Sequence, residues 1–314
     1  MTLERVPQSR RRRLVLLLNG AGVGLTIATL GGFLGTALPG LDIFAHFRVH
    51  YTLAALVLVA VALRTRARKT AAGILVVLAI NAATLAPYVS VMPAQARTPA
   101  LTLVALNLRI DNPETDRVLA FLRRENADVV VLSEISPHWE EALKSLADVY
   151  PHRVDKLDCR PRINCSVLML AKAPWQDAGV LRAEDAPPLV WARVARNGRD
   201  VTVIGTHLMW PFAPRLQARQ VETLAAFVRR LDTPVVVAGD LNLTPWSALF
   251  ARLESQAKLR RAKGGIVQTW PAGLVPFGIP IDHALTDLPP DAVALRAGPD
   301  VGSDHLPIIV DLRL

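Results

Sequence analysis

The N-terminal third of the chain consists largely of apolar runs. Residues 14–38 contain no charged side chain, and residues 71–92 form a second run that is nearly as uniform. Helices of these lengths rise by about 37 Å and about 33 Å, enough to cross a bilayer core of about 30 Å. Residues 43–63 between them are less regular, and their uninterrupted apolar part rises by only about 20 Å. We therefore predict three transmembrane helices at about 14–38, 43–63 and 71–92, with two spans and a surface helix as the alternative.

The middle run carries polar side chains near its start. To cross a membrane it has to include His46, Arg48 and His50, which we expect at the interface, reaching toward water. A cleavable signal peptide is an alternative for the N-terminus, because the arginines at 10–13 precede an apolar run. That run is longer than a signal core and further membrane-like sequence follows it. Residues 1–94 are therefore predicted to be a membrane anchor.

From about residue 95 the pattern changes to that of a globular domain, in which short runs rich in Val and Leu alternate with segments of helical spacing. Strands are predicted at 101–107, 128–132, 166–171, 189–194, 201–206, 234–238 and 307–312. Helices are predicted at 116–126, 137–146 and 217–230. Continuous apolar strands indicate sheets covered on both faces, so residues 95–314 are predicted to form one layered α/β domain.

The positive charge of the chain is concentrated in the predicted anchor. The formal net charge is +9, and residues 1–70 hold ten of the 36 Lys and Arg but two of the 27 Asp and Glu. The remainder is nearly neutral, so the high isoelectric point does not by itself indicate nucleic-acid binding. The basic clusters at 10–13 and 64–69 are typical of cytoplasmic flanks. Three spans then predict an extracytoplasmic domain, held in a bacterial inner or plasma membrane.

The chain has two cysteines, Cys159 and Cys165, in the polar stretch DCRPRINCS. In an oxidising compartment they could close a short disulfide loop, and two independent thiols are the alternative. Neither belongs to a four-ligand zinc pattern.

Polar side chains recur where the predicted strands end. They are Asn107, Glu134, His207, Asp240 with Asn242, Asp282 with His283, and Asp304 with His305. Such residues can converge at one edge of a layered fold, and carboxylate and amide oxygens suit a hard cation such as Mg²⁺. Hydrolysis of a phosphoester needs a cation, a group that orients or deprotonates water, and donors toward the transition state. The set supplies each kind of group and favours a metal-dependent phosphoesterase.

Six short motifs, in order, resemble the endonuclease/exonuclease/phosphatase superfamily. They are VALNLR from Val104, SE at Ser133, GTHL from Gly205, GDLN from Gly239, IDH from Ile281 and GSDHLP from Gly302. This superfamily includes deoxyribonuclease-I-like nucleases, apurinic endonucleases, neutral sphingomyelinases and inositol polyphosphate 5-phosphatases. The resemblance covers about residues 101–314. It implies a four-layer α/β sandwich with two central mixed β-sheets flanked by helices, preceded here by the transmembrane segment.

The resemblance also implies a metal site for Mg²⁺ or Mn²⁺. Glu134 would be the main ligand, Asn107 would lie beside it as a ligand or phosphate contact, and Asp304 would lie at the metal or its water shell. A turn-forming Asn and a charge at the start of a helix are the alternatives for Asn107 and Glu134.

The remaining residues are assigned to catalysis by the same resemblance. Asp240 would orient or deprotonate the attacking water, and Asn242 would hold a phosphate oxygen. His305 would contact the scissile phosphate, with its tautomer fixed by Asp282. His207 would be a phosphate contact or general acid. A plain turn, a structural pair and a packed histidine are the respective alternatives.

Four further features have less defined roles. His283 is expected to be structural, and Asn164 matches a family Asn that precedes a similar strand. Trp210 and Phe212 either line the mouth of the site or cover the core. The domain leaves little room for long insertions, so the segment 264–281 is the predicted specificity loop.

We therefore expect a membrane-anchored, divalent-metal-dependent hydrolase of phosphodiester bonds, with a nuclease ahead of a sphingomyelinase-like lipid phosphodiesterase or a phosphatase. The substrate is a nucleic acid or a phospholipid, the helices contact the bilayer, and no obligate protein partner is expected. An inactive phosphate-binding membrane scaffold is the non-enzymatic alternative. It predicts the loss of a site residue, and none of the six motifs lacks one.

Overall fold

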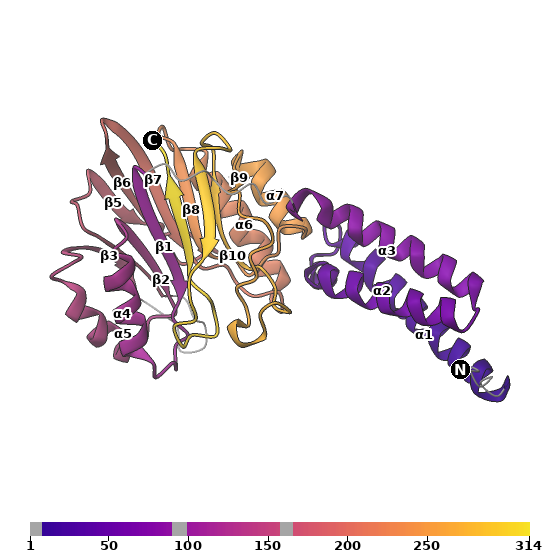
Figure 1. The fold of residues 1–314 in the computed structure, drawn as a ribbon. Coiled ribbons are helices and arrows are strands. Elements are labelled where there is room, and N and C mark those ends of the chain that lie inside the picture. Colours follow the sequence, from indigo (N-terminus) through magenta and orange to yellow (C-terminus); the bar gives the residue numbers. More distant parts are fainter. Residues whose placement is uncertain (1–7, 90–98, 158–165) are drawn as a thin grey trace. The chain divides into compact units, whose positions relative to one another are not determined.

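The computed structural model describes residues 8–89, 99–157 and 166–314. The chain divides into two compact units, a helical unit and an α/β unit (Figure 1). The helical unit consists of α1 (Gln8–Gly31), α2 (Arg48–Arg64) and α3 (Arg68–Val89), with two 3-10 segments, η1 (Gly32–Leu34) and η2 (Pro39–Phe47), between α1 and α2.

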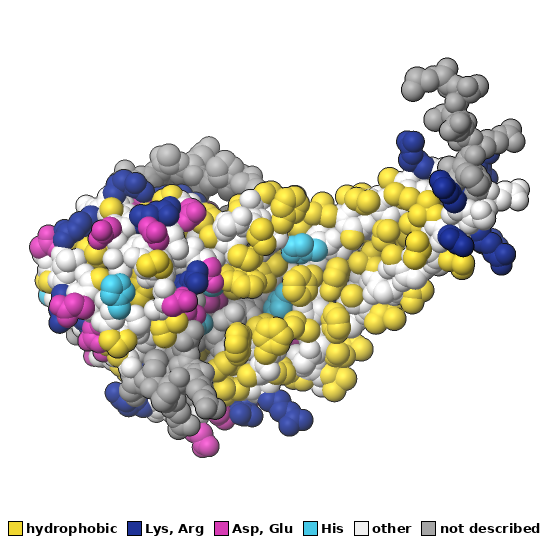
Figure 2. Space-filling model, turned by 90° about the horizontal axis from the view of Figure 1, so that it is seen from below, with side chains coloured by type: hydrophobic (Ala, Val, Ile, Leu, Met, Phe, Trp, Pro, Cys, Tyr) yellow, Lys and Arg dark blue, Asp and Glu magenta, His cyan; other side chains and the backbone are white. Residues whose placement is uncertain are grey.

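Three segments of the helical unit are long and apolar enough to cross a membrane. They are Gln8–Leu34, Pro39–Arg64 and Arg68–Val89. The number agrees with the prediction, but the first segment begins six residues earlier than predicted, so that it includes the basic cluster at 10–13, and the second is completed by η2. Apolar side chains cover the outside of the bundle, as a surface that faces lipid requires (Figure 2).

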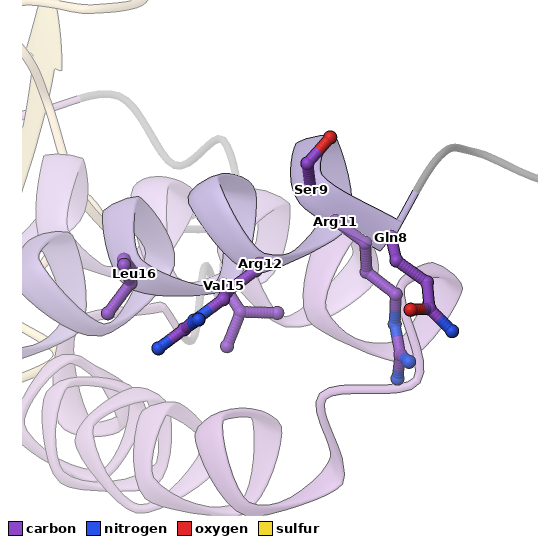
Figure 3. A pocket seen from close by; sticks show the side chains of 6 residues that line it. All are labelled: Gln8, Ser9, Arg11, Arg12, Val15 and Leu16. Carbon is purple, nitrogen blue, oxygen red and sulfur yellow. The ribbon is translucent and has the colours of Figure 1, made fainter.

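The two basic clusters lie at the same end of this bundle. Arg11 Nε donates a hydrogen bond to the carbonyl oxygen of Thr65, in the turn between α2 and α3, at 3.0 Å. A shallow depression beside this contact is lined by Gln8, Ser9, Arg11, Arg12, Val15 and Leu16 (Figure 3). Its lining comes from successive turns of one helix, so it is a helix surface and not an enclosed binding site.

The prediction that Arg48 reaches the interface is wrong. Its side chain is buried, and Nη1 donates to Asn81 Oδ1 at 3.2 Å. Asn81 Nδ2 in turn donates to Thr29 Oγ1 at 2.9 Å, so the three helical segments share one polar contact. His46 is buried as well. The reason is that η2 extends the second span at its start, which places both residues well inside it.

The α/β unit is built on two six-stranded mixed sheets (Figure 1). The first has the order β11-β12-β1-β2-β4-β3 and consists of β1 (Leu101–Asn107), β2 (Val129–Ser133), β3 (His152–Lys156), β4 (Val167–Ala171), β11 (Val293–Ala297) and β12 (Ile308–Leu312). The second has the order β5-β6-β7-β8-β10-β9 and consists of β5 (Asp177–Val180), β6 (Leu189–Arg196), β7 (Arg199–Thr206), β8 (Val235–Asp240), β9 (Arg260–Arg261) and β10 (Asp282–Thr286). β1 with β2 and β7 with β8 are parallel pairs, and the other neighbours are antiparallel.

Helices cover the outer face of each sheet. They are α4 (Thr115–Glu125), α5 (Pro137–Leu143) and η3 (Lys144–Leu146) on the first sheet, and α6 (Pro214–Val228) and α7 (Ala248–Ala257) on the second, with η4 (Ala272–Leu274) in a loop. Because strand side chains alternate, Leu103 and Val131 pack into the core between the sheets while Leu106 and Val130 pack beneath α4 and α5. The predicted four-layer α/β sandwich is confirmed.

His283 is buried, and its side chain connects β10 to neighbouring segments through hydrogen bonds. Its Nδ1 accepts a hydrogen bond from Arg261 Nε at 3.2 Å, and its Nε2 lies 2.8 Å from the carbonyl oxygen of Leu243 and 3.1 Å from that of Pro280. These partners require a neutral imidazole protonated at Nε2. Burial, with the nearby charge of Arg261, lowers the pKa of His283 to about 3. The structural role expected for this residue is consistent with these contacts.

Replacing Asn81 by Leu should destabilise the helical unit. Arg48 would keep its buried guanidinium but lose its acceptor, which costs about 1–3 kcal/mol. Unfolding of the full-length protein with a denaturing detergent, followed by circular dichroism, measures this loss. The matched control is Asn19→Leu, which removes an interhelical hydrogen bond from Thr70 at an exposed position. Equal losses in the two variants would contradict the assignment.

The His283 imidazole should make the protein less stable as the pH falls. The unfolded chain protonates near pH 6.5 and the folded state near pH 3, so between these values the unfolded state binds one more proton. The stabilisation present above pH 6.5 is therefore lost below it, at up to about 1.4 kcal/mol per pH unit. Urea unfolding at several pH values, followed by tryptophan fluorescence, should show a shallower decline for His283→Gln than for the natural protein. Parallel declines would refute this.

Candidate active site

The predicted site residues lie at one edge of the sandwich. β1, β2, β7 and β8 end at this edge, and β10 and β12 begin there because they run antiparallel to β8 and β1. In register, Asp282 lies opposite Asp240. The edge is opposite to the one at which β12 ends, close to the C-terminus (Figure 1). Strand direction alone therefore collects polar residues that are far apart in the sequence.

Asn107 links the two sheets at this edge. Its Nδ2 donates to Glu134 Oε1 and to Asp240 Oδ2, both at 3.0 Å. Its Oδ1 accepts from the backbone N–H of Arg109 at 2.9 Å, which fixes the orientation of the amide. In this arrangement Asn107 positions two carboxylates, and a direct bond from its oxygen to a metal would require the amide to turn.

Glu134 has the features of a ligand for a hard cation. Its Oε1 accepts from an amide and its Oε2 accepts from the backbone N–H of Ile110 at 3.1 Å, so its negative charge has no cationic hydrogen-bond partner among the described residues. The backbone at Glu134 is left-handed, with φ of 59°, an uncommon conformation for this residue type. Asp111 first, and then the charges of Asp304 and Glu134, raise the pKa of Arg109, which places these acids at the same edge. A site of carboxylate oxygens fits Mg²⁺ or Mn²⁺.

A second group of side chains also converges closely enough to hold an ion. Within the described part of the chain, ligand atoms of Asp240, Asp282 and His305 lie within 4.8 Å of one another. His305 Nδ1 is already hydrogen-bonded to Asp282 Oδ2 at 2.9 Å, and a cation would have to displace this proton. We therefore assign this group to proton and phosphate contacts and keep Glu134 as the favoured cation ligand.

Asp282 and His305 are both buried, and each favours the charged form of the other. Burial alone raises the pKa of Asp282, but the charge of His305 and hydrogen bonds from His305 and Thr269 outweigh it and lower this pKa. Burial alone lowers the pKa of His305, but Asp282 and then Asp240 raise it to about 10. Because Asp282 holds Nδ1, the Nε2 of His305 faces the Asp240 carboxylate, 3.7 Å from Oδ2.

Asp240 is the acid on which these contacts converge. Its Oδ1 accepts from the backbone N–H of Asn242 at 2.9 Å, and its Oδ2 lies 3.5 Å from His207 Nε2. Burial, opposed by His305 and reinforced by Asp282, raises its pKa above the ordinary value. A carboxylate in this environment is suited to accept a proton or to orient water.

His207 and Asn242 form the other side of the site. Asn242 Nδ2 lies 3.3 Å from His207 Nε2 and donates to the carbonyl oxygen of Leu208 at 3.0 Å. Gln217 Nε2 donates to the carbonyl oxygen of Asn242 at 3.1 Å. His207 Nδ1 is buried and has no hydrogen-bond partner among the described residues. The structure therefore brings His207 and Asn242 together beside Asp240.

Two glycines of the motifs are required by the backbone. Gly239 has φ of 141°, and a Cβ there would lie 2.0 Å from the carbonyl oxygen of Thr206. Gly302 has φ of 90°, and a Cβ there would lie 2.5 Å from the Cβ of Glu114. Neither position accepts a side chain, so these glycines let the strand ends that carry Asp240 and His305 approach their neighbours.

From the sequence, Ser303 was not singled out, and Trp270 was named only as a member of the predicted specificity loop. Ser303 Oγ donates to the carbonyl oxygen of Asn107 at 2.7 Å and accepts from the backbone N–H of His305 at 3.1 Å. Trp270 Nε1 donates to Asp304 Oδ2 at 3.1 Å. What could have pointed to these residues is their position in the sequence: Ser303 lies inside the motif GSDHLP, and Trp270 lies inside the predicted specificity loop. The loop is thereby tied to the site.

Two other sequence interpretations can be compared with the structure. Trp210 and Phe212 are exposed, so they do not cover the core. Asn164, Cys159 and Cys165 lie outside the described residues, and their predicted roles stay predictions.

The fold is shared with solved structures of low sequence identity. Humanized TDP2 of D. rerio aligns with a TM-score of 0.57 and 18% identity, over 68% of this chain and 99% of that one. Sphingomyelinase C from Streptomyces griseocarneus aligns with a TM-score of 0.55 and 19% identity, over 69% and 100%. Beta toxin from Staphylococcus aureus, in a structure with bound magnesium ions, aligns with a TM-score of 0.54 and 18% identity, over 69% and 100%.

Sequence comparison gives the family. No curated protein sequence matches the chain. The model of the Endonuclease/Exonuclease/phosphatase family matches residues 104–305, which include every assigned site residue and cover most of the α/β unit. The chain therefore belongs to the Endonuclease/Exonuclease/phosphatase family of metal-dependent phosphoester hydrolases.

Proposed function

We propose that the chain is a membrane-anchored phosphodiesterase that uses Mg²⁺ or Mn²⁺. The observation that carries this proposal is the environment of Asp240. Its carboxylate accepts hydrogen bonds from Asn107 and Asn242 and lies near the ring nitrogens of His207 and His305. Acid, amide and imidazole groups thus surround one small volume, as hydrolysis of a phosphoester requires.

Glu134 and Asp304 would hold the cation at this edge. The donor set supports this assignment because the hydrogen bonds to Glu134 come from the neutral groups of Asn107 and Ile110, so both carboxylate oxygens keep their negative charge. A bound cation would neutralise charge on the phosphate oxygens. Asn107 and Trp270 would keep the two carboxylates in place through the hydrogen bonds that they donate.

The chain's own residues would handle the water and the phosphate. Asp240 would orient the attacking water and accept its proton. His305 Nε2 would donate to a phosphate oxygen, since Asp282 holds the opposite ring nitrogen and fixes the ring. Asn242 and His207 would supply further contacts from the second sheet. These donors are already positioned, so little reorganisation is needed when phosphate charge develops.

We further propose that residues 1–94 anchor the enzyme and that residues 95–314 form the catalytic domain outside the cytoplasm. Three candidate spans leave the two ends of the anchor on opposite sides of a membrane. The contact between Arg11 and Thr65 supports this orientation because it places both basic clusters at one end of the bundle.

The proposal can be tested with full-length protein in nanodiscs and a soluble chromogenic substrate, bis(p-nitrophenyl) phosphate. We expect hydrolysis with Mg²⁺ or Mn²⁺ that stops on addition of EDTA. Glu134→Gln should raise the metal concentration needed for half-maximal activity, because one ligand charge is lost. His305→Ala should lower kcat by about 100-fold or more, the usual effect of losing a transition-state donor.

The matched control for Glu134→Gln is Glu141→Gln, an exposed acid on α5 that pairs with Lys144. It should leave both the activity and the metal dependence unchanged. Metal-independent hydrolysis, or full activity in His305→Ala, would show that this edge is not the catalytic site.

A further inference from the structure

We propose that the edge carrying the site is a lipid-docking surface and that the substrate is a phosphoester headgroup presented by a membrane. This inference rests on the proposed function, because it names the class of substrate for the same site. From the sequence we expected a nuclease ahead of a lipid phosphodiesterase, and this inference places the lipid substrate first.

The observation behind it is the distribution of exposed apolar side chains. In the described part of the α/β unit, the large apolar side chains that are exposed occur on three loops. They are Ile110, the pair Trp210 and Phe212, and four residues between 270 and 277. Phe212 is 76% exposed and Trp210 is 59% exposed. We call these side chains the apolar rim.

Each of the three loops is attached to a site residue. The backbone N–H of Ile110 donates to Glu134, and Trp270 Nε1 donates to Asp304. The loop that carries Trp210 follows directly after His207 at the end of β7. The apolar rim therefore borders the site and does not belong to a separate face of the molecule.

Exposed apolar area of this kind needs a partner. Monomeric soluble proteins rarely gather large apolar side chains in one exposed region, and Trp and Phe are favoured where apolar and polar phases of a membrane meet. The rings of Trp210 and Phe212 contact each other edge-on, with centroids 5.7 Å apart, so they present one combined surface. Such a surface gains free energy by entering the headgroup region of a leaflet.

The cations near the site are divided: Arg215, in the first turn of α6, is exposed, whereas others are paired or distant. A nuclease needs cations beside its site, because phosphate contacts dominate nucleic-acid affinity. Arg109, on the same loop as Ile110, is paired with Asp111 at 2.7 Å. Arg196 and Arg199, which flank the turn between β6 and β7, lie at the end of these strands opposite to Leu189 and Thr206, where the strands reach the site.

The membrane that the rim would contact is the one crossed by the chain's own candidate spans. β1 starts at the edge remote from the site, and its seven residues are about 23 Å long. Residues 90–100, between the last helix and β1, can extend to at most about 40 Å.

The reaction at this surface would be a hydrolysis. Water adds to phosphorus, the bond from phosphorus to the leaving oxygen breaks, and the proton lost by the water ends on the leaving alcohol. Glycerophospholipids and sphingolipids share this phosphodiester. We therefore propose the headgroup linkage as the bond that is cleaved, and the experiment distinguishes the two lipid backbones.

Contact with lipid can be measured without reference to activity. All six tryptophans follow residue 138, so none lies in a candidate span. Full-length protein is placed in nanodiscs of phosphatidylcholine and phosphatidylglycerol, with or without bromine on the acyl chains, and tryptophan quenching is recorded. We expect strong quenching that is lost in Trp210→Phe/Trp270→Phe, which lacks the rim fluorophores.

A second pair of variants tests the rim itself. Phe212→Ser/Leu274→Ser should reduce quenching and should lower phosphate-headgroup release from nanodiscs of phosphatidylglycerol or sphingomyelin by about tenfold or more. The matched control, Phe212→Leu/Leu274→Met, keeps both sites apolar and should retain both signals. Hydrolysis of bis(p-nitrophenyl) phosphate should be unchanged in both double variants of Phe212 and Leu274, since neither side chain belongs to the catalytic set.

The outcomes separate the two proposals. Quenching equal in the natural protein and in Trp210→Phe/Trp270→Phe would overturn the docking surface, and two chains per nanodisc in that case would assign the rim to a second copy. Lipid hydrolysis that is unaffected by the Ser variants, or cleavage of DNA or RNA in place of lipid, would overturn the substrate class. Normal quenching without hydrolysis of any phosphodiester would leave the docking surface standing and remove the proposed function.

Discussion

The amide of Asn107 is the contact on which the arrangement of the site depends. It projects from the first sheet and reaches a carboxylate of the second, so it connects the two sheets at this edge, as the contact of His305 with Asp282 also does. Two acids that would otherwise repel each other share its donor group, and Ser303 holds the same residue from its backbone. Without such a bridge, the facing sheet ends would carry Glu134 and Asp240 with no neutral group between them.

The part of the site formed by Asp240, Asp282 and His305 is distinguished by its burial. Asp240 and Asp282 are both inaccessible to water, and a single imidazole, that of His305, lies against the two. Removing charges from water is expensive, and the mutual attraction within the group offsets part of that cost. The arrangement is therefore better explained by catalysis than by stability, because well-packed apolar residues would hold the strands together at least as well.

Much of this architecture could be predicted from sequence, for a physical reason. Strands such as β1 and β2 are buried on both faces, so their apolar runs are continuous and the polar residue after each run marks a strand end. β3 and β5 were not predicted because they are half-exposed and lack a clear apolar period. β10 was missed because it opens with site residues, which conceal a short strand.

Within the site, some residues could be predicted from the sequence and others could not. Asn107, Asp240 and His305 occupy motif positions, and the structure brings them together. Thr269 and Ser303 were missed because each acts on another polar group, and a lone hydroxyl residue carries no distinctive local pattern. The left-handed backbone at Glu134 has no signal in the sequence either, since Glu is not a residue that favours it.

The buried Arg48 has a consequence for how the proposed anchor would enter a membrane. The guanidinium lies on the second helical segment, but its amide acceptor arrives only with the third, 33 residues later in synthesis. An arginine left in hydrocarbon without that acceptor is strongly unfavourable. In the proposed anchor, the contact among Arg48, Asn81 and Thr29 would be completed only once the third segment has been synthesised, so we expect the three helices to settle in lipid as one unit.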